Sequence, residues 1–77
     1  MRWNVELTDT FGGEANYSWC SRETMELPET ATDRQIITAA KAALGLTGQR
    51  CRRFDHGEGF VLRPIGACAV AFVLPAY

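Results

Sequence analysis

Residues 32–45 read TDRQIITAAKAALG, and this stretch predicts the one helix against which the other segments pack. Thr32 and Gln35 have the spacing of a capping box. In that motif the threonine hydroxyl accepts a hydrogen bond from an otherwise unpaired backbone N–H, and the glutamine side chain accepts one in return. Gly45 is a natural stop for the helix. The apolar face of this helix is expected to consist of Ile36, Ile37, Ala40, Ala43 and Leu44.

Two strands are predicted before the helix. Residues 2–8 alternate between apolar and polar side chains, and residues 14–21 alternate again, so each is typical of a half-buried strand. The Gly12-Gly13 pair between them indicates a turn, and the second strand is expected to continue to Leu27 past an irregularity. The alternation places the aromatic residues Trp3, Tyr17 and Trp19 in one core.

Three further strands are predicted after the helix, at residues 49–55, 60–65 and 68–74. The last of them is apolar on both faces, which is typical of a strand at the centre of a sheet or under a helix. Short connections favour antiparallel hairpins. The sequence therefore predicts an α+β fold with a single antiparallel sheet of about five strands and one helix packed across one face. The chain order is β-β-α-β-β-β, and residues 1–77 form a single domain.

The charges are distributed unevenly along the chain. Residues 1–30 hold two arginines against six carboxylates, a net charge of −4, whereas residues 31–77 hold six basic residues against three carboxylates, a net charge of +3. A small protein with such polarity is suited to docking on a charged macromolecule.

A candidate partner-binding surface follows from the acidic half of the sequence. Spaced carboxylates on a small domain can imitate a row of phosphates and dock at a Lys/Arg-lined site of a partner. The alternative is that these carboxylates only keep the surface soluble. Phe11, in the glycine turn, is either an exposed interface anchor or a lid on the core. The candidate residues are Asp9, Phe11, Glu14, Glu23, Glu26, Glu29 and Asp33.

The arginines support an alternative function, nucleic-acid binding. Arginines on a sheet, with Phe54 and Phe60 nearby, can contact phosphates and stack on bases. They are equally compatible with a solvated strand face paired to Asp55 or Glu58, and the acidic sequence pI of about 5.7 argues against a nucleic-acid module. The candidate nucleic-acid-binding residues are Arg50, Arg52, Arg53 and Arg63. A third reading is an assembly factor that forms a homodimer through a free sheet edge.

Neither catalysis nor cofactor binding is predicted. Asp55 and His56 have no nucleophile beside them, and the chain has no P-loop, nucleophile elbow or dinucleotide fingerprint. Cys20, Cys51 and Cys68 are odd in number and widely spaced, so we expect neither a zinc site nor a disulfide framework. We expect no signal peptide and no membrane segment, and hence a cytoplasmic protein, monomeric or weakly dimeric.

Three stretches together resemble short proteins encoded by bacteriophages and other mobile elements of proteobacteria. They are residues 9–19 (DTFGGEANYSW), residues 41–48 (KAALGLTG), and residues 51–53 with 63–66 (CRR and RPIG). In size, polarity and fold class the chain is also similar to small anti-CRISPR proteins that act on type I systems. The resemblance implies a non-enzymatic inhibitor that binds a host CRISPR effector complex and blocks either target-DNA recognition or nuclease recruitment. Such proteins share no common motif, so no functional residue is carried over.

Overall fold

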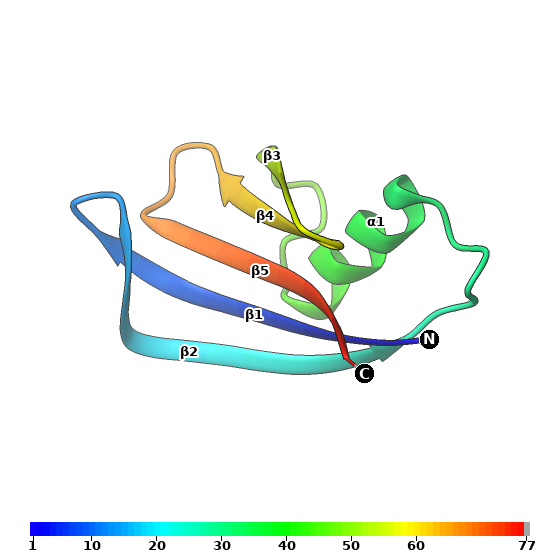
Figure 1. Ribbon diagram of the computed structural model, residues 1–77. Helices are drawn as coiled ribbons and strands as arrows, with labels where there is room; N and C mark the ends of the chain where they lie inside the picture. The colour runs from blue at the N-terminus through cyan, green and yellow to red at the C-terminus, as the bar shows by residue number, and fades with distance from the viewer. Residues whose placement is uncertain (77) are drawn as a thin grey trace.

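The computed structural model describes residues 1–76 and confirms the predicted fold class: one antiparallel sheet with a single helix (Figure 1). The strands are β1 (Arg2–Phe11), β2 (Glu14–Glu26), β3 (Cys51–His56), β4 (Gly59–Pro64) and β5 (Ala69–Ala76), and helix α1 (Asp33–Ala43) lies between β2 and β3 in the sequence. The strand order across the sheet is β2-β1-β5-β4-β3, so the doubly apolar β5 is the central strand, as its composition predicts.

Helix α1 begins at the predicted capping box. The Thr32 hydroxyl accepts from the Gln35 backbone N–H at 3.2 Å, and the Gln35 side chain accepts from the Thr32 N–H at 2.9 Å. The buried helical positions are Ile36, Ala40 and Leu44, an i, i+4, i+8 row that drifts around the helix. Ala43 lies off this row and is exposed, so its predicted place on the buried face is wrong.

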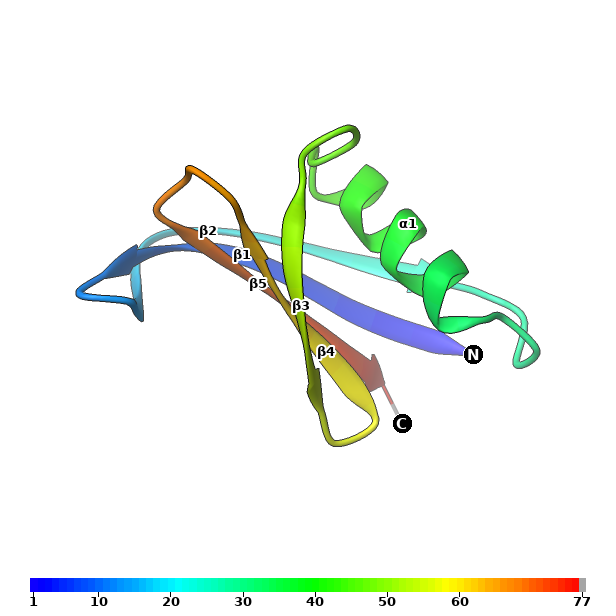
Figure 2. The same ribbon diagram turned by 90° about the horizontal axis from the view of Figure 1, so that it is seen from above.

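The core lies between α1 and one face of the sheet (Figure 2). Trp3 of β1 and Phe60 of β4 stack there with ring centroids 6.4 Å apart. The remaining buried core residues are Val5, Leu7, Met25, Ile36, Ala40, Leu44, Leu62, Ala71 and Val73. In residues 1–76 no helix is both long and apolar enough to cross a membrane.

A large, irregular bulge interrupts β2 and makes part of the predicted core wrong. Thr8 pairs with Cys20 and Thr10 pairs with Ala15, so four residues of β2, 16–19, lie opposite Asp9 alone. The chain turns there through a positive φ of 56° at Tyr17. The bulge breaks the alternation on which the prediction rested. Tyr17 and Trp19 are about half exposed, and only Trp3 of the three predicted aromatic residues lies in the core.

Candidate functional site

The carboxylate of Asp9 organises the bulge. It accepts hydrogen bonds from the Ser18 hydroxyl at 2.6 Å, the Asn16 side-chain amide at 2.9 Å and the Ser18 backbone N–H at 2.9 Å. The Ser18 hydroxyl, followed by the Asn16 amide, holds the pKa of Asp9 far below its usual range, because both stabilise the charged form. Asp9 was predicted as a partner-binding residue, and the structure places its carboxylate within the hairpin's own hydrogen bonds.

The β1–β2 and β4–β5 turns lie at the same end of the molecule (Figure 1). Phe11 is exposed at the β1–β2 turn, Ile65 is exposed in the β4–β5 turn, and Trp19 is exposed in the neighbouring bulge of β2. The Thr10 N–H donates to the Cys68 carbonyl oxygen at 3.1 Å, and the Arg63 guanidinium donates to the Gly13 carbonyl oxygen at 3.0 Å, so the two turns are tied together. We call this surface the aromatic end; its residues are Phe11, Trp19 and Ile65. Phe11 is 79% exposed, which favours the anchor over the lid.

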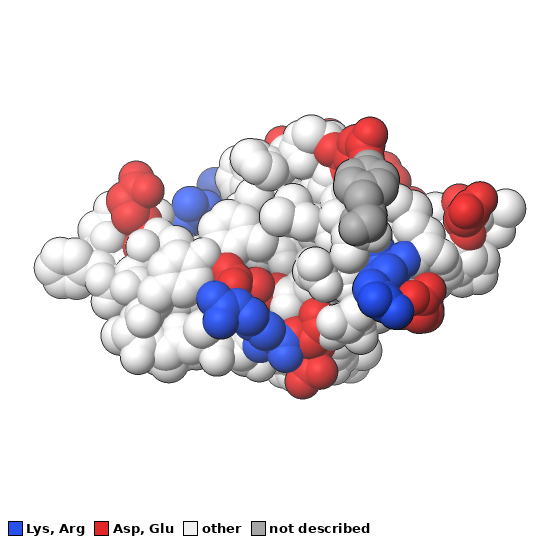
Figure 3. Space-filling view, turned by 60° about the horizontal axis from the view of Figure 1, so that its bottom comes forward, with Lys and Arg blue, Asp and Glu red and all other residues white. Residues whose placement is uncertain are grey.

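The predicted acidic residues do not form one surface. Glu26 pairs with the Arg2 side chain at 3.2 Å and with the N-terminal amine at 3.6 Å, and Asp33 pairs with Arg53 at 2.9 Å. Three others are exposed and form no ion pair with any other residue in 1–76; they are Glu14 and Glu23, at distant positions along β2, and Glu29, between β2 and α1. Figure 3 shows acidic and basic side chains next to one another on the face it presents.

The predicted arginine patch is divided between the two faces of the sheet. Arg52 of β3 pairs directly with Arg63 of β4 on the face opposite α1. Arg53 points to the other face, where its guanidinium lies 4.7 Å from the centre of the Phe60 ring and bonds to Asp33 and Asp55. Arg50 is exposed and precedes β3. The structure therefore brings together two of the four arginines.

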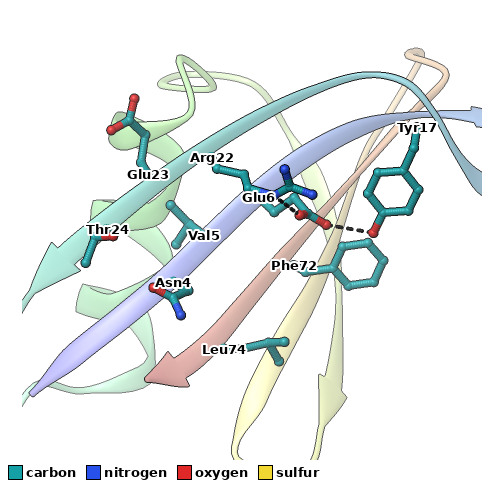
Figure 4. Close-up of a pocket in the computed structure, with 9 residues that line it drawn as sticks. All are labelled: Asn4, Val5, Glu6, Tyr17, Arg22, Glu23, Thr24, Phe72 and Leu74. Carbon is teal, nitrogen blue, oxygen red and sulfur yellow. Dashed lines mark hydrogen bonds and ion pairs between the residues drawn. The ribbon is translucent and has the colours of Figure 1, made fainter. Parts of the chain in front are cut away.

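A groove of about 560 Å3 runs along the sheet face opposite α1 (Figure 4). Glu6 lies in it, accepting from the Tyr17 hydroxyl at 2.7 Å and from the Arg22 guanidinium at 2.7 Å. The Tyr17 hydroxyl and then Arg22 lower the pKa of Glu6, and Glu6 in turn raises the pKa of Tyr17. The groove is lined by Asn4, Val5, Glu6, Tyr17, Arg22, Glu23, Thr24, Phe72 and Leu74.

Sequence reasoning missed this groove. Glu6, Arg22 and Phe72 become neighbours only because β1 pairs with both β2 and β5. Tyr17 reaches Glu6 from the bulge, which no local pattern predicts. The one available signal was the second apolar face of β5, which carries Phe72 and Leu74.

Chemically, the exposed surfaces offer stacking, hydrogen bonding and charge contact. Within residues 1–76, no group of three or more histidine, cysteine or carboxylate side chains is placed to hold a metal ion. No protein-family model matches the chain, and no curated protein or solved structure matches it either.

Proposed function

We propose that this protein is a non-enzymatic inhibitor of the anti-CRISPR kind, which binds a type I CRISPR effector complex in the cytoplasm of an infected bacterial host. The observation that carries the proposal is the aromatic end. Phe11 and Trp19 are exposed on the β1–β2 hairpin, and Ile65 is exposed in the β4–β5 turn, which hydrogen bonds tie to that hairpin. Aromatic side chains are the usual anchors of protein–protein interfaces.

The bracing supports a binding role for this end. Asp9 fixes the bulge through three hydrogen bonds, and Arg63 ties the turn to β4. A preorganised hairpin loses little conformational freedom when it docks, so more of the contact energy is available for affinity. Phe11 is therefore the anchor that we expect to contribute most.

Acidic imitation of DNA is the inhibitory mechanism that we propose. Glu14 pairs with Phe11 across the hairpin, so a carboxylate lies beside the anchor. Docking of Phe11 would carry Glu14 toward a DNA-binding surface, where the partner's lysines and arginines are already arranged for anions. Glu23 and Glu29 are the other predicted acidic residues that are exposed and form no ion pair in the described part of the chain.

The test is phage plaquing on CRISPR-immune bacteria that express the protein, with several type I subtypes compared. We expect restored plaquing in one subtype, followed by co-purification of the protein with that effector complex. Phe11→Ala should weaken binding to the complex by about 30-fold or more, the size of an interface hot spot. Charge reversal at Glu14 should reduce competition with target DNA.

The matched control is Thr38→Ala, which truncates an exposed residue on α1, away from the aromatic end. It should inhibit like the unmodified protein. Absence of plaquing in every subtype would overturn the proposed function. Full inhibition by the Phe11→Ala variant would overturn the role of the aromatic end.

A further inference from the structure

The face of the sheet opposite α1, which we call the open face, carries a row of apolar side chains across its strands. Phe72 of β5 pairs with Val61 of β4, and Val61 pairs with Phe54 of β3. Phe54 is 48% exposed, and Phe72 and Val61 are partly exposed. Tyr17, 50% exposed, reaches across Glu6 beside Phe72, and both rings line the groove (Figure 4).

Two arginines lie next to this row on the same face. Arg52 is two residues from Phe54 on β3, and Arg63 is two residues from Val61 on β4, so the pleat directs all four side chains to one side. Arg52 and Arg63 are direct cross-strand partners. Like charges in that position are destabilising unless something compensates for them.

The compensation does not come from carboxylates in the described part of the chain. Neither Arg52 nor Arg63 forms an ion pair there, and Arg63 donates to a neutral carbonyl oxygen, that of Gly13. By contrast, the charge of Arg22 on the same face is balanced by Glu6 at 2.7 Å. The open face is therefore locally positive on a chain whose formal net charge is −1.

Protection of a sheet edge does not account for both arginines. A charged side chain on the edge strand β3 discourages pairing with another sheet, which would explain Arg52. Arg63 lies on β4, which is flanked by β3 and β5, so it has no edge to protect. A second copy of the chain is also a poor occupant. A two-fold symmetric contact between open faces would bring four uncompensated arginines into one interface.

We propose that the open face binds single-stranded nucleic acid, with bases stacking on Phe54 and Phe72 and phosphates held by Arg52 and Arg63. Neighbouring strands are about 4.8 Å apart, so these two rings, two strands apart, are separated by roughly 10 Å across the sheet. Bases must be unstacked to reach such rings, which excludes a duplex. Arg63 also braces the aromatic end, but Phe54, Phe72 and Arg52 belong to the open face alone, so the inference goes beyond the proposed function without depending on it.

The experiment is fluorescence anisotropy with the isolated protein and labelled oligouridine, oligothymidine and a DNA duplex. We expect saturable binding to the single strands at low salt and much weaker binding to the duplex. Phe54→Leu should weaken single-strand binding by about 5-fold or more, the lower range for loss of one base-stacking ring. Arg52→Gln should reduce the salt-dependence slope by about 1.

Arg34→Gln is the matched control, because it removes an exposed arginine from α1, on the other side of the sheet. It should bind like the unmodified protein. The proposal would be overturned by no saturable binding, by equal weakening in the Arg34 and Arg52 variants, or by self-association that Phe54→Leu abolishes. It would also be overturned if Phe54→Leu impaired capture of a protein partner while the unmodified protein bound no oligonucleotide. No effector complex takes part in the titration, so its failure leaves the proposed function untouched.

Discussion

At the scale of single residues, Asp9 fixes the shape of the bulge that contributes to both candidate surfaces. Its carboxylate accepts three hydrogen bonds from residues 16–18, and the Thr8 hydroxyl beside it donates to the Trp19 carbonyl oxygen at 2.8 Å. These contacts hold Tyr17 over Glu6 and expose Trp19. A residue that the sequence suggested as a binding group thus positions both candidate surfaces.

Asp9 should make the stability of the protein depend on pH. The pKa of Asp9 is lower in the folded chain than in the unfolded chain, so its contribution to stability is complete above the ordinary carboxyl range. That contribution shrinks as the pH falls below this range and is fully lost only below the lowered folded pKa. Asp9→Asn should lower the melting temperature at neutral pH, and the difference from the unmodified protein should shrink below about pH 4. Thermal melts of both proteins from neutral pH to below about pH 4 measure this difference in melting temperature.

Glu14→Gln is the control for this prediction, because it removes a charge from the same hairpin without touching the bulge. A melting temperature of the Asp9→Asn variant that tracked the unmodified protein at every pH would contradict the organising role of Asp9.

At the scale of elements, the capped helix was predicted correctly, whereas the path of β2 was not. The Thr32–Gln35 capping box and the alternation of β1 are local patterns, and each is fixed by neighbours in the sequence. The bulge depends on how β2 pairs with β1, and the wrong placement of Trp19 follows from that. Local patterns also located β3, β4 and β5 to within about two residues of their observed ends.

The close approach of β4 to β5 requires a glycine at position 59. A Cβ atom at this position would collide with the carbonyl oxygen of Val73 on β5, so β4 needs a glycine there. Gly59→Ala should lower the free energy of unfolding by about 1–3 kcal/mol, although alanine is ordinarily better than glycine in a strand. Chemical denaturation measures the loss.

The neighbouring exposed residue provides the comparison. Glu58→Ala, in the same turn, should change the free energy of unfolding by no more than about 0.5 kcal/mol. If Gly59→Ala were as stable as the unmodified protein, β4 and β5 would not approach each other this closely.

At the scale of the whole molecule, one helix covers one face of a five-stranded sheet, and the other face remains open (Figure 2). The sequence predicted this two-layer architecture, because only one segment has helical periodicity. The composition of the open face could not be predicted, because Phe72, Val61 and Phe54 come from three strands whose order is a property of the complete sheet. Alternation along a strand does predict that Arg53 points away from the face of Arg52, and the structure confirms this.

Ala40 sets the distance between the two layers. It is completely buried between α1 and the sheet, where a larger side chain has no room. Ala40→Leu should lower the free energy of unfolding by about 1–3 kcal/mol. For a domain of this size that corresponds to a melting temperature lower by roughly 4–8 °C for each kcal/mol.

Ala42→Leu makes the same chemical change on the exposed side of α1 and should leave the melting temperature almost unchanged. Equal effects of the two substitutions would show that the helix does not pack on the sheet through Ala40.

The pairing of β1 with β5 has a consequence for synthesis on the ribosome. β1 is translated before the other four strands and β5 after them, yet β1 and β5 lie side by side in the sheet, with Arg2 opposite Ala76. While the chain is being translated, the β1–β2 hairpin forms before β5 exists to pair with β1. The apolar side chains of the hairpin therefore stay exposed until β5 has been made. The nascent hairpin therefore exposes apolar surface that chaperones recognise, and the sheet is completed only once β5 has emerged.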